Sequence, residues 1–131
     1  PLDCKRDPVP FTILLQINKQ SIMKTGIEAI TEERRRQIYE ESWSPIHDDQ
    51  HTNEELARAA AAYALPDRFR EKLRNGKPKL FPFAVKWWKP ASFSEKDGKY
   101  INDRKRQLAK AGALIAAEYD RLVRLEEKQE G

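Results

Sequence analysis

Residues 43–55 read Trp-Ser-Pro-Ile-His-Asp-Asp-Gln-His-Thr-Asn-Glu-Glu, and this stretch decides where the helices on either side of it end and begin. Pro45 disfavours helical backbone in the residue before it, so a helix arriving from the N-terminal side must stop near Glu41. Thr52 and Glu55 have the spacing of a capping box, in which the hydroxyl and the carboxylate accept hydrogen bonds from free backbone amides at a helix start. We therefore predict a loop between two helices, bounded by the proline and by the cap.

Apolar residues at helical spacing predict three principal helices, over residues 26–41, 53–64 and 103–127. The first begins at a second capping box, formed by Thr25 and Glu28. The second contains a run of alanines, which allows neighbouring helices to approach closely, and Pro66 stops it. We expect an all-α fold in which these three helices form a small bundle.

The third predicted helix carries an apolar stripe that we assign to the core, formed by Leu108, Ala111, Gly112, Ile115, Tyr119 and Leu122. A glycine inside a helix costs about 1 kcal/mol relative to alanine, so Gly112 indicates a close crossing of another helix. The expected partner is Ala59 or Ala60 of the alanine-rich helix. Glu118 lies between apolar positions, so its carboxylate needs a partner such as Arg34, must stay protonated, or must reach solvent.

Residues 80–90 read Leu-Phe-Pro-Phe-Ala-Val-Lys-Trp-Trp-Lys-Pro and form the most aromatic segment of the chain. Its two prolines disfavour a long helix or a central strand, so we predict a packed loop that closes one end of the bundle. Trp87 and Trp88 must point in different directions. We expect one of them in the core and the other exposed beside Lys89, where it can stack on a ring. Residues 91–100 are polar, contain an Asp-Gly pair and predict a flexible loop.

The first 22 residues differ from the rest, because they combine prolines with one short apolar run over residues 11–17. The only methionine, Met23, lies directly ahead of the first predicted helix. We predict that translation naturally begins at Met23 and that residues 1–22 are a poorly structured upstream extension. Residues 23–131 are then expected to form a single helical domain.

Composition narrows the classes of function. Charged residues make up 35% of the 131 residues, but lysine and arginine alternate with acidic residues and the net charge is only +4, so a nucleic-acid surface is disfavoured. No apolar run approaches the length of a membrane span, and we expect no membrane partner. The single cysteine, Cys4, excludes an internal disulfide and favours a reducing, cytoplasmic setting.

Imidazole and carboxylate groups gather in the loop before the second helix. His47, Asp48, Asp49 and His51 offer ligands for a divalent metal, with His47, Asp49 and His51 as the candidate set. Their geometry is unspecified in a loop. The competing interpretation is that an aspartate forms a turn or caps the helix, while the histidines lie at the surface or at the edge of the core.

A set of short motifs is spread over residues 27–125. They are Glu33-Arg-Arg-Arg-Gln37, Trp43, His47-Asp-Asp-Gln-His51, Glu55-Leu-Ala-Arg-Ala-Ala-Ala-Ala-Tyr-Ala64, Trp87-Trp-Lys-Pro90 and Lys110-Ala-Gly-Ala-Leu-Ile-Ala-Ala-Glu118. Together they resemble a family of small proteins encoded by phages and prophages, to which no activity is assigned. The resemblance implies an accessory protein acting in the cytoplasm of a bacterial host, and it implies nothing about mechanism.

We favour binding of a small anionic ligand over catalysis. The expected pocket combines the first helix, the histidine loop, the tryptophan turn and the third helix, and its residues are Arg34, Gln37, Glu41, His47, Asp48, Asp49, His51, Trp87, Trp88, Lys89 and Glu118. Arginine with aromatic and imidazole groups suits a ring-bearing anion such as a nucleotide. On the first helix, the simpler interpretation is that these polar residues flank the core with their heads in water.

Two other functions stay open from the sequence. The first is metal-dependent hydrolysis of nucleotides or phosphoesters, with His47, Asp48, Asp49 and Glu118 around the ion. The second is a protein-interaction module that binds a host factor, or a second copy of this chain, through exposed aromatic side chains.

Overall fold

The structure, a computed structural model, describes residues 24–130, so the predicted start at Met23 and the extension over residues 1–22 lie outside it. Most of the described residues are helical, as the sequence predicts. The helices are α2 (Gly26–Tyr39), α3 (Pro45–Asp49), α4 (Glu55–Ala64) and α5 (Arg104–Glu130). Two short 3₁₀ turns, η1 (Asp67–Phe69) and η2 (Val85–Trp87), and a hairpin of β1 (Ala91–Ser94) and β2 (Lys99–Asn102) complete the described elements.

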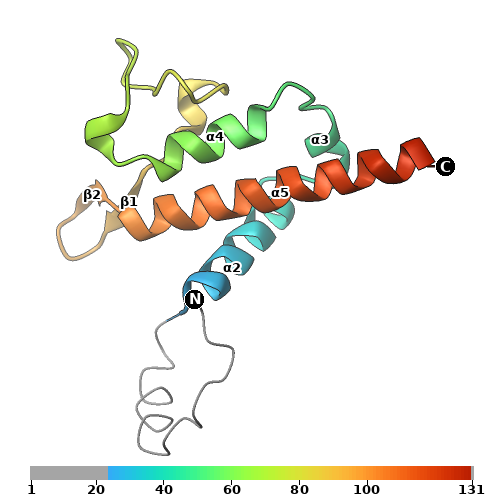
Figure 1. The fold of residues 1–131 in the computed structure, drawn as a ribbon. Helices are drawn as coiled ribbons and strands as arrows, with labels where there is room; N and C mark the ends of the chain where they lie inside the picture. The colour runs from blue at the N-terminus through green and yellow to red at the C-terminus, as the bar shows by residue number, and fades with distance from the viewer. Residues whose placement is uncertain (1–23, 131) are drawn as a thin grey trace, which may run out of the picture.

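Helix α5 spans the molecule, and the other elements are arranged along it (Figure 1). Its main contacts are with α4 and α2, and α3 packs against it more weakly. The β1–β2 hairpin lies at its N-terminal end (Figure 1), with Ala91 paired to Asn102 and Ser94 paired to Lys99. The organising element is therefore the last helix of the chain.

The apolar core lies between α4, α5 and the aromatic loop of residues 80–90. Its largest fully buried side chains are Leu56 and Leu114, and most of the remaining core positions on the two helices are alanines. These small side chains let α4 and α5 approach closely, as the alanine run predicts. The loop seals this seam with Trp88, which stacks on Tyr63 at 4.4 Å between ring centroids and contacts Phe81.

Two arginines from other elements cap the C-terminal end of α4. Arg70 donates hydrogen bonds to the carbonyls of Ala62 and Tyr63, at 2.8 and 3.1 Å. Arg104, the first residue of α5, donates to the carbonyls of Tyr63 and Leu65. The last turn of α4 contains no basic residue of its own. These long-range contacts therefore supply hydrogen-bond donors for its free carbonyls and positive charge near the negative end of its dipole.

Three local predictions are wrong. Residues 91–102 form the β1–β2 hairpin instead of a flexible loop, and Gly98, with φ of 64°, lies in its turn. The histidine stretch contains the short helix α3, because Ser44 caps it and Pro45 occupies its first turn. The Thr52 capping box does not form, because Glu54 adopts φ of 62° at the start of α4 and makes no side-chain cap.

The buried face of α5 is also different from the predicted stripe. Four of the six predicted stripe residues are exposed: Leu108, Ile115, Tyr119 and Leu122. Of the six, only Ala111 is buried in the core. The close crossing at Gly112 is real, but its partner is Ile30 of α2 instead of Ala59 or Ala60 of α4. A Cβ built on Gly112 would lie 2.5 Å from Ile30 Cδ1, so any side chain there requires Ile30 to move.

Within residues 24–130, no helix has the combination of length and apolar character that crossing a membrane requires.

Candidate functional site

A small cavity of about 140 Å³ lies where α3, the start of α4 and the aromatic loop meet. We call it the aromatic–imidazole pocket. It is lined by Trp43, His47, His51, Leu56, Phe83 and Trp87. Three of these residues, His47, His51 and Trp87, are among the predicted ligand-binding residues. Trp43 appears in the resemblance motifs, whereas Phe83 was not singled out, because one phenylalanine among several gives no signal in the sequence.

Four aromatic rings of this pocket lie next to one another, and each is adjacent to two of the others. Trp43 stacks on His47 with an angle of 10° between ring planes, and His47 meets His51 edge to face at 4.9 Å between centroids. His51 in turn meets Phe83 at 5.1 Å, and Phe83 lies 6.4 Å from Trp43. Each ring restrains its neighbours, so the pocket wall is preorganised for a ligand.

Local backbone features place the two histidines together. Ser42 adopts φ of 60° and turns the chain out of α2, and the Trp43 amide then donates to the carbonyl of Gln37 at 2.9 Å. Ser44 caps α3 by accepting a hydrogen bond from the His47 amide at 3.2 Å. Because α3 continues for about one turn, His51 follows on the same side of the chain.

Each histidine is held by a carboxylate through its Nδ1 atom. His51 Nδ1 lies 3.2 Å from Glu55 Oε2, and His47 Nδ1 lies 3.4 Å from Asp48 Oδ1. Burial alone would raise the pKa of Glu55, but its hydrogen bonds, first among them that from His51, outweigh this and lower it. Glu55 therefore stays a carboxylate, and a neutral His51 ring carries its proton on Nδ1.

The other ring nitrogen of His51 is the unusual group of the site. His51 Nε2 is buried and has no hydrogen-bond partner within the described part of the chain. In the neutral ring with its proton on Nδ1, Nε2 presents a lone pair and is an acceptor without a donor. A buried polar atom without a partner is costly, and it is a specific feature that a ligand can satisfy.

The pocket has a cationic outer edge. Trp87 is 41% exposed, and the Nζ atoms of Lys86 and Lys89 lie 5.3 and 5.5 Å from the centroid of its ring. Trp88 is partly buried and packs against the core, where it stacks on Tyr63. The exposed tryptophan is Trp87.

The predicted site residues of α2 do not face this pocket as a group. Arg34 donates to the fully buried Asp48 at 2.8 Å and so anchors α3 beneath the histidines. Gln37 is buried beside Glu33, and Glu41 accepts a hydrogen bond from Arg36 at 3.0 Å. None of these three residues lines the aromatic–imidazole pocket, and each is already engaged within the protein.

The two remaining acidic candidates are also held elsewhere. Asp49 pairs with Arg124 at 2.8 Å, and this contact lowers the pKa of Asp49. Glu118 pairs with Arg121 on its own helix at 2.5 Å instead of with the expected Arg34. Among residues 24–130 no group of three or more histidine, cysteine or acidic side chains is placed to hold a metal ion, so the donor set of the metal hypothesis is not gathered.

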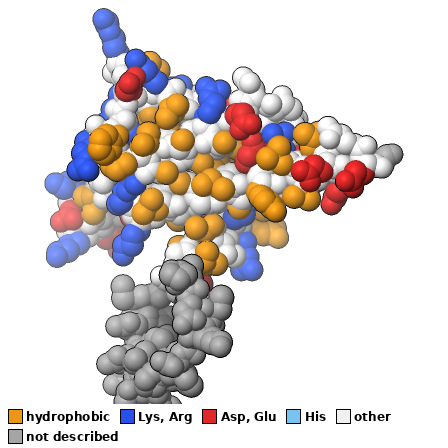
Figure 2. Space-filling model, viewed as in Figure 1, with side chains coloured by type: hydrophobic (Ala, Val, Ile, Leu, Met, Phe, Trp, Pro, Cys, Tyr) orange, Lys and Arg blue, Asp and Glu red, His pale blue; other side chains and the backbone are white. Residues whose placement is uncertain are grey.

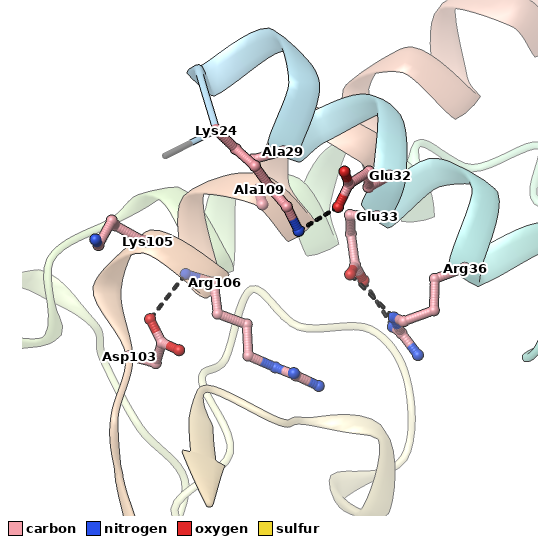
Figure 3. A pocket seen from close by; sticks show the side chains of 9 residues that line it. All are labelled: Lys24, Ala29, Glu32, Glu33, Arg36, Asp103, Lys105, Arg106 and Ala109. Atoms are coloured by element: carbon pink, nitrogen blue, oxygen red, sulfur yellow. Dashed lines mark hydrogen bonds and ion pairs between the residues drawn. The ribbon is translucent and has the colours of Figure 1, made fainter. Parts of the chain in front are cut away.

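A second, larger hollow of about 690 Å³ lies between α2 and the start of α5. Figure 3 shows this charged cleft, which is lined by Lys24, Ala29, Glu32, Glu33, Arg36, Asp103, Lys105, Arg106 and Ala109. Its charges largely pair with one another: Lys24 with Glu32, and Arg36 with Glu33 at 2.6 Å. Arg106 extends its guanidinium into the cleft (Figure 3), and its buried Nε has no partner among the described residues.

The inner wall of the charged cleft is a buried ion-pair network. Lys110 donates to Glu33 at 3.2 Å, and burial lowers the pKa of Lys110. Burial would raise the pKa of Glu33, but hydrogen bonds and charges from Arg36 and Lys110 outweigh it and lower that pKa. Four basic and three acidic residues line the cleft, so it is close to neutral and does not favour a highly charged anion.

Comparison with models of protein families, with curated proteins and with solved structures found no match for this chain. The resemblance to phage-encoded proteins therefore stays a prediction. Of the two hollows, the aromatic–imidazole pocket has the stronger features of a binding site. It combines stacked rings with one oriented acceptor that lacks a partner.

Proposed function

We propose that the aromatic–imidazole pocket binds the ring of a small, anionic, nucleotide-like ligand. The observation that carries the proposal is the buried, unpartnered Nε2 of His51, oriented by Glu55 inside a wall of aromatic rings. A planar ring with an N–H donor satisfies this atom and stacks against its neighbours. Purine and pyrimidine bases have this combination of features.

The size of the pocket limits how much of the ligand it takes. Its volume of about 140 Å³ is below the roughly 300 Å³ at which pockets for drug-sized ligands begin. A single ring system therefore enters, and the remainder of a nucleotide stays at the edge. There Lys86 and Lys89, beside the exposed Trp87, are available for a phosphate group.

Binding is favoured over hydrolysis by the state of the carboxylates. Asp48, Asp49 and Glu118, which the hydrolase alternative would use around a metal, each contact an arginine. In our proposal α2, α4 and α5 form the three-helix framework predicted from the sequence, and residues 80–90 close the end that carries the pocket. The resemblance to phage proteins supports an accessory role in a bacterial cytoplasm.

Quenching of tryptophan fluorescence tests the proposal, because two tryptophans of the pocket wall would contact the ligand. Nucleoside monophosphates and the corresponding nucleosides serve as probes, and we expect saturable quenching by at least one base. His51→Phe keeps a flat ring but removes the acceptor, and should weaken binding about tenfold. Replacing Lys86 and Lys89 with glutamine should weaken binding of the monophosphate and leave the nucleoside unaffected.

The matched control is Tyr100→Ala, which removes an exposed aromatic residue of β2 outside the pocket and should change nothing. The thermal unfolding midpoint of each variant is measured first, so that binding is compared only among variants that are folded at the temperature of the titration. The proposal is overturned if no probe gives saturable quenching, or if His51→Phe binds as tightly as the parent protein. Release of phosphate during the titration would favour the hydrolase alternative.

A further inference from the structure

One side of α5, which we call the outer face, carries large apolar side chains in contact with water. It comprises Leu108, Ile115, Tyr119 and Leu122, whose exposed fractions are 47%, 58%, 69% and 42%. Their spacings of three, four and seven residues place them on one side of the helix. Figure 2 shows hydrophobic side chains along the length of α5. A continuous strip of this kind on a soluble surface marks a contact with another molecule.

No element among residues 24–130 covers the outer face. Helix α4 packs beside the outer face, on the side of α5 where Ala111, Leu114 and Ala117 join the core. Helix α2 crosses α5 at its flank, through Ile30 and Gly112. The occupant must therefore come from outside this part of the chain.

The spacing of the strip is symmetric. Leu108, Ile115 and Leu122 are separated by seven residues each, so Ile115 lies midway between the two leucines. If a second copy lies antiparallel with the two-fold axis at Ile115, each Leu108 meets Leu122 of the other copy, and the two Ile115 side chains meet each other. A seven-residue apolar repeat is the spacing that two packed helices require.

The charges of α5 favour the antiparallel arrangement. Its first three residues are basic, Arg104, Lys105 and Arg106, whereas its last five residues contain Glu126, Glu127 and Glu130 with one lysine, Lys128, and so carry a net negative charge. An antiparallel copy brings the exposed Lys105 close to Glu126 of its partner, twice by symmetry. A parallel copy would place basic ends together and acidic ends together, and would align the two helix dipoles unfavourably.

From this combination we propose that the outer face of α5 is the interface of a homodimer with two antiparallel α5 helices, related by a two-fold axis at Ile115. The same patch then serves on both subunits, which is the geometry of a closed two-fold dimer. The outer face has four large apolar side chains, fewer than the roughly 20–30 residues that each partner contributes to a standard interface, so the dissociation constant is expected to be on the order of micromolar. The proposal is independent of the ligand assigned to the pocket.

Sedimentation equilibrium of the full chain measures the association. Dimers are expected at tens of micromolar concentration, on the order of ten times the dissociation constant. Ile115→Glu puts two carboxylates at the axis and should leave only monomers at that concentration. The control is Ile46→Glu, which alters an exposed isoleucine on α3, a helix held through the opposite side of α5 by Asp49 and Arg124. It should dimerise like the parent, and a parent chain that stays monomeric overturns the proposal.

Crosslinking tests the orientation, with Cys4→Ser in every variant. A thiol crosslinker with a span of about 10 Å should join two copies of the Ile115→Cys variant. It should not join two copies of Leu108→Cys, because residues 108 of the two subunits lie about 21 Å apart along antiparallel helices. A mixture of Leu108→Cys and Leu122→Cys should crosslink. Self-crosslinking of Leu108→Cys as efficient as that of Ile115→Cys would contradict the antiparallel arrangement.

Discussion

The two faces of α5 differ in an unusual way, because its buried face carries charged and polar residues and its exposed face carries large apolar ones. On the inner face Gln107, Lys110, Glu118 and Arg121 are buried together with alanines and one leucine. On the outer face Leu108, Ile115, Tyr119 and Leu122 are in water. The inner face can bury charged groups because each of them has an ion-pair partner. The outer face has the apolar composition of a protein–protein interface, and no described residue covers it.

The partners on the inner face come from three directions. Lys110 pairs with Glu33 of α2, Glu118 pairs with Arg121 within α5, and Gln107 accepts from Arg70 of the loop after α4 at 2.9 Å. A buried charge is tolerated only when it is paired and hydrogen-bonded. The polar side of this helix can therefore lie inside, because each of its buried charges is paired. This pairing also predicts where the chain is most sensitive to change.

The largest expected effect follows from removing a partner on the inner face. Glu33→Gln keeps the shape of the side chain but leaves Lys110, whose side chain is 5% exposed, beside a neutral amide. The free energy of unfolding at pH 7 should fall by about 3 kcal/mol, because one charge of a buried pair loses its counterion. Urea denaturation monitored by circular dichroism measures this loss.

The neighbouring residue provides the control for that variant. Glu32 pairs with Lys24, and both side chains are more than half exposed. Glu32→Gln should therefore change stability by less than about 0.5 kcal/mol. If the two glutamine variants are equally stable, the inner face does not depend on its ion pairs, and the distinction between the faces fails.

A smaller loss of folding stability is expected from a substitution where α2 crosses α5. Gly112→Ala adds a Cβ that would lie 2.5 and 2.6 Å from two side-chain atoms of Ile30, so Ile30 must move. We expect a loss of about 2 kcal/mol from overpacking, partly offset by the better helix propensity of alanine. Thermal denaturation measures it. Gly26→Ala, at a helical glycine with free space around its Cβ position, should be neutral or slightly stabilising, and a stabilised Gly112→Ala variant would disprove the tight crossing.

The smallest of these losses should appear on acidification. The pKa of Glu33 lies below its ordinary value of 4.5 in the folded protein. As the pH falls below about 4.5, the unfolded chain takes up the proton first, so stability is lost until the pH has passed through the folded pKa. The parent protein should therefore lose more stability between pH 5 and pH 3 than Glu33→Gln does. Urea midpoints at several pH values measure the difference, and equal losses would mean that Glu33 carries no part of the acid sensitivity.

The helices were predictable because their signals are local. Thr25 caps α2 as predicted, with the Glu28 amide donating to Thr25 Oγ1 at 3.2 Å, although the Glu28 carboxylate accepts from the Thr25 hydroxyl at 3.0 Å instead of from its amide. Pro66 follows the end of α4. The faces of α5 were not predictable. Periodicity shows that a helix has an apolar side, but it does not show which side meets the core when distant residues such as Glu33 neutralise the polar one.

The candidate site was predictable in part for the same reason. His47, His51 and Trp87 were singled out by residue type, and they do line one pocket. The expected convergence of Arg34 and Glu118 depended on long-range pairing, which helical spacing does not determine. Arg34 instead supports the pocket from below by binding the buried Asp48, and Glu118 is held by the adjacent turn of its own helix.

The most direct test of the difference between the faces compares two adjacent residues, Leu114 and Ile115, by urea denaturation at a low and a high protein concentration. Leu114 is 1% exposed, so Leu114→Ala should lose about 3 kcal/mol at both concentrations. Ile115→Ala should lose less than about 0.5 kcal/mol at the low concentration, and more only at the high one, where the dimer stabilises the parent. A loss for Ile115→Ala at low concentration that equals the loss for Leu114→Ala would place Ile115 in the core and contradict the account.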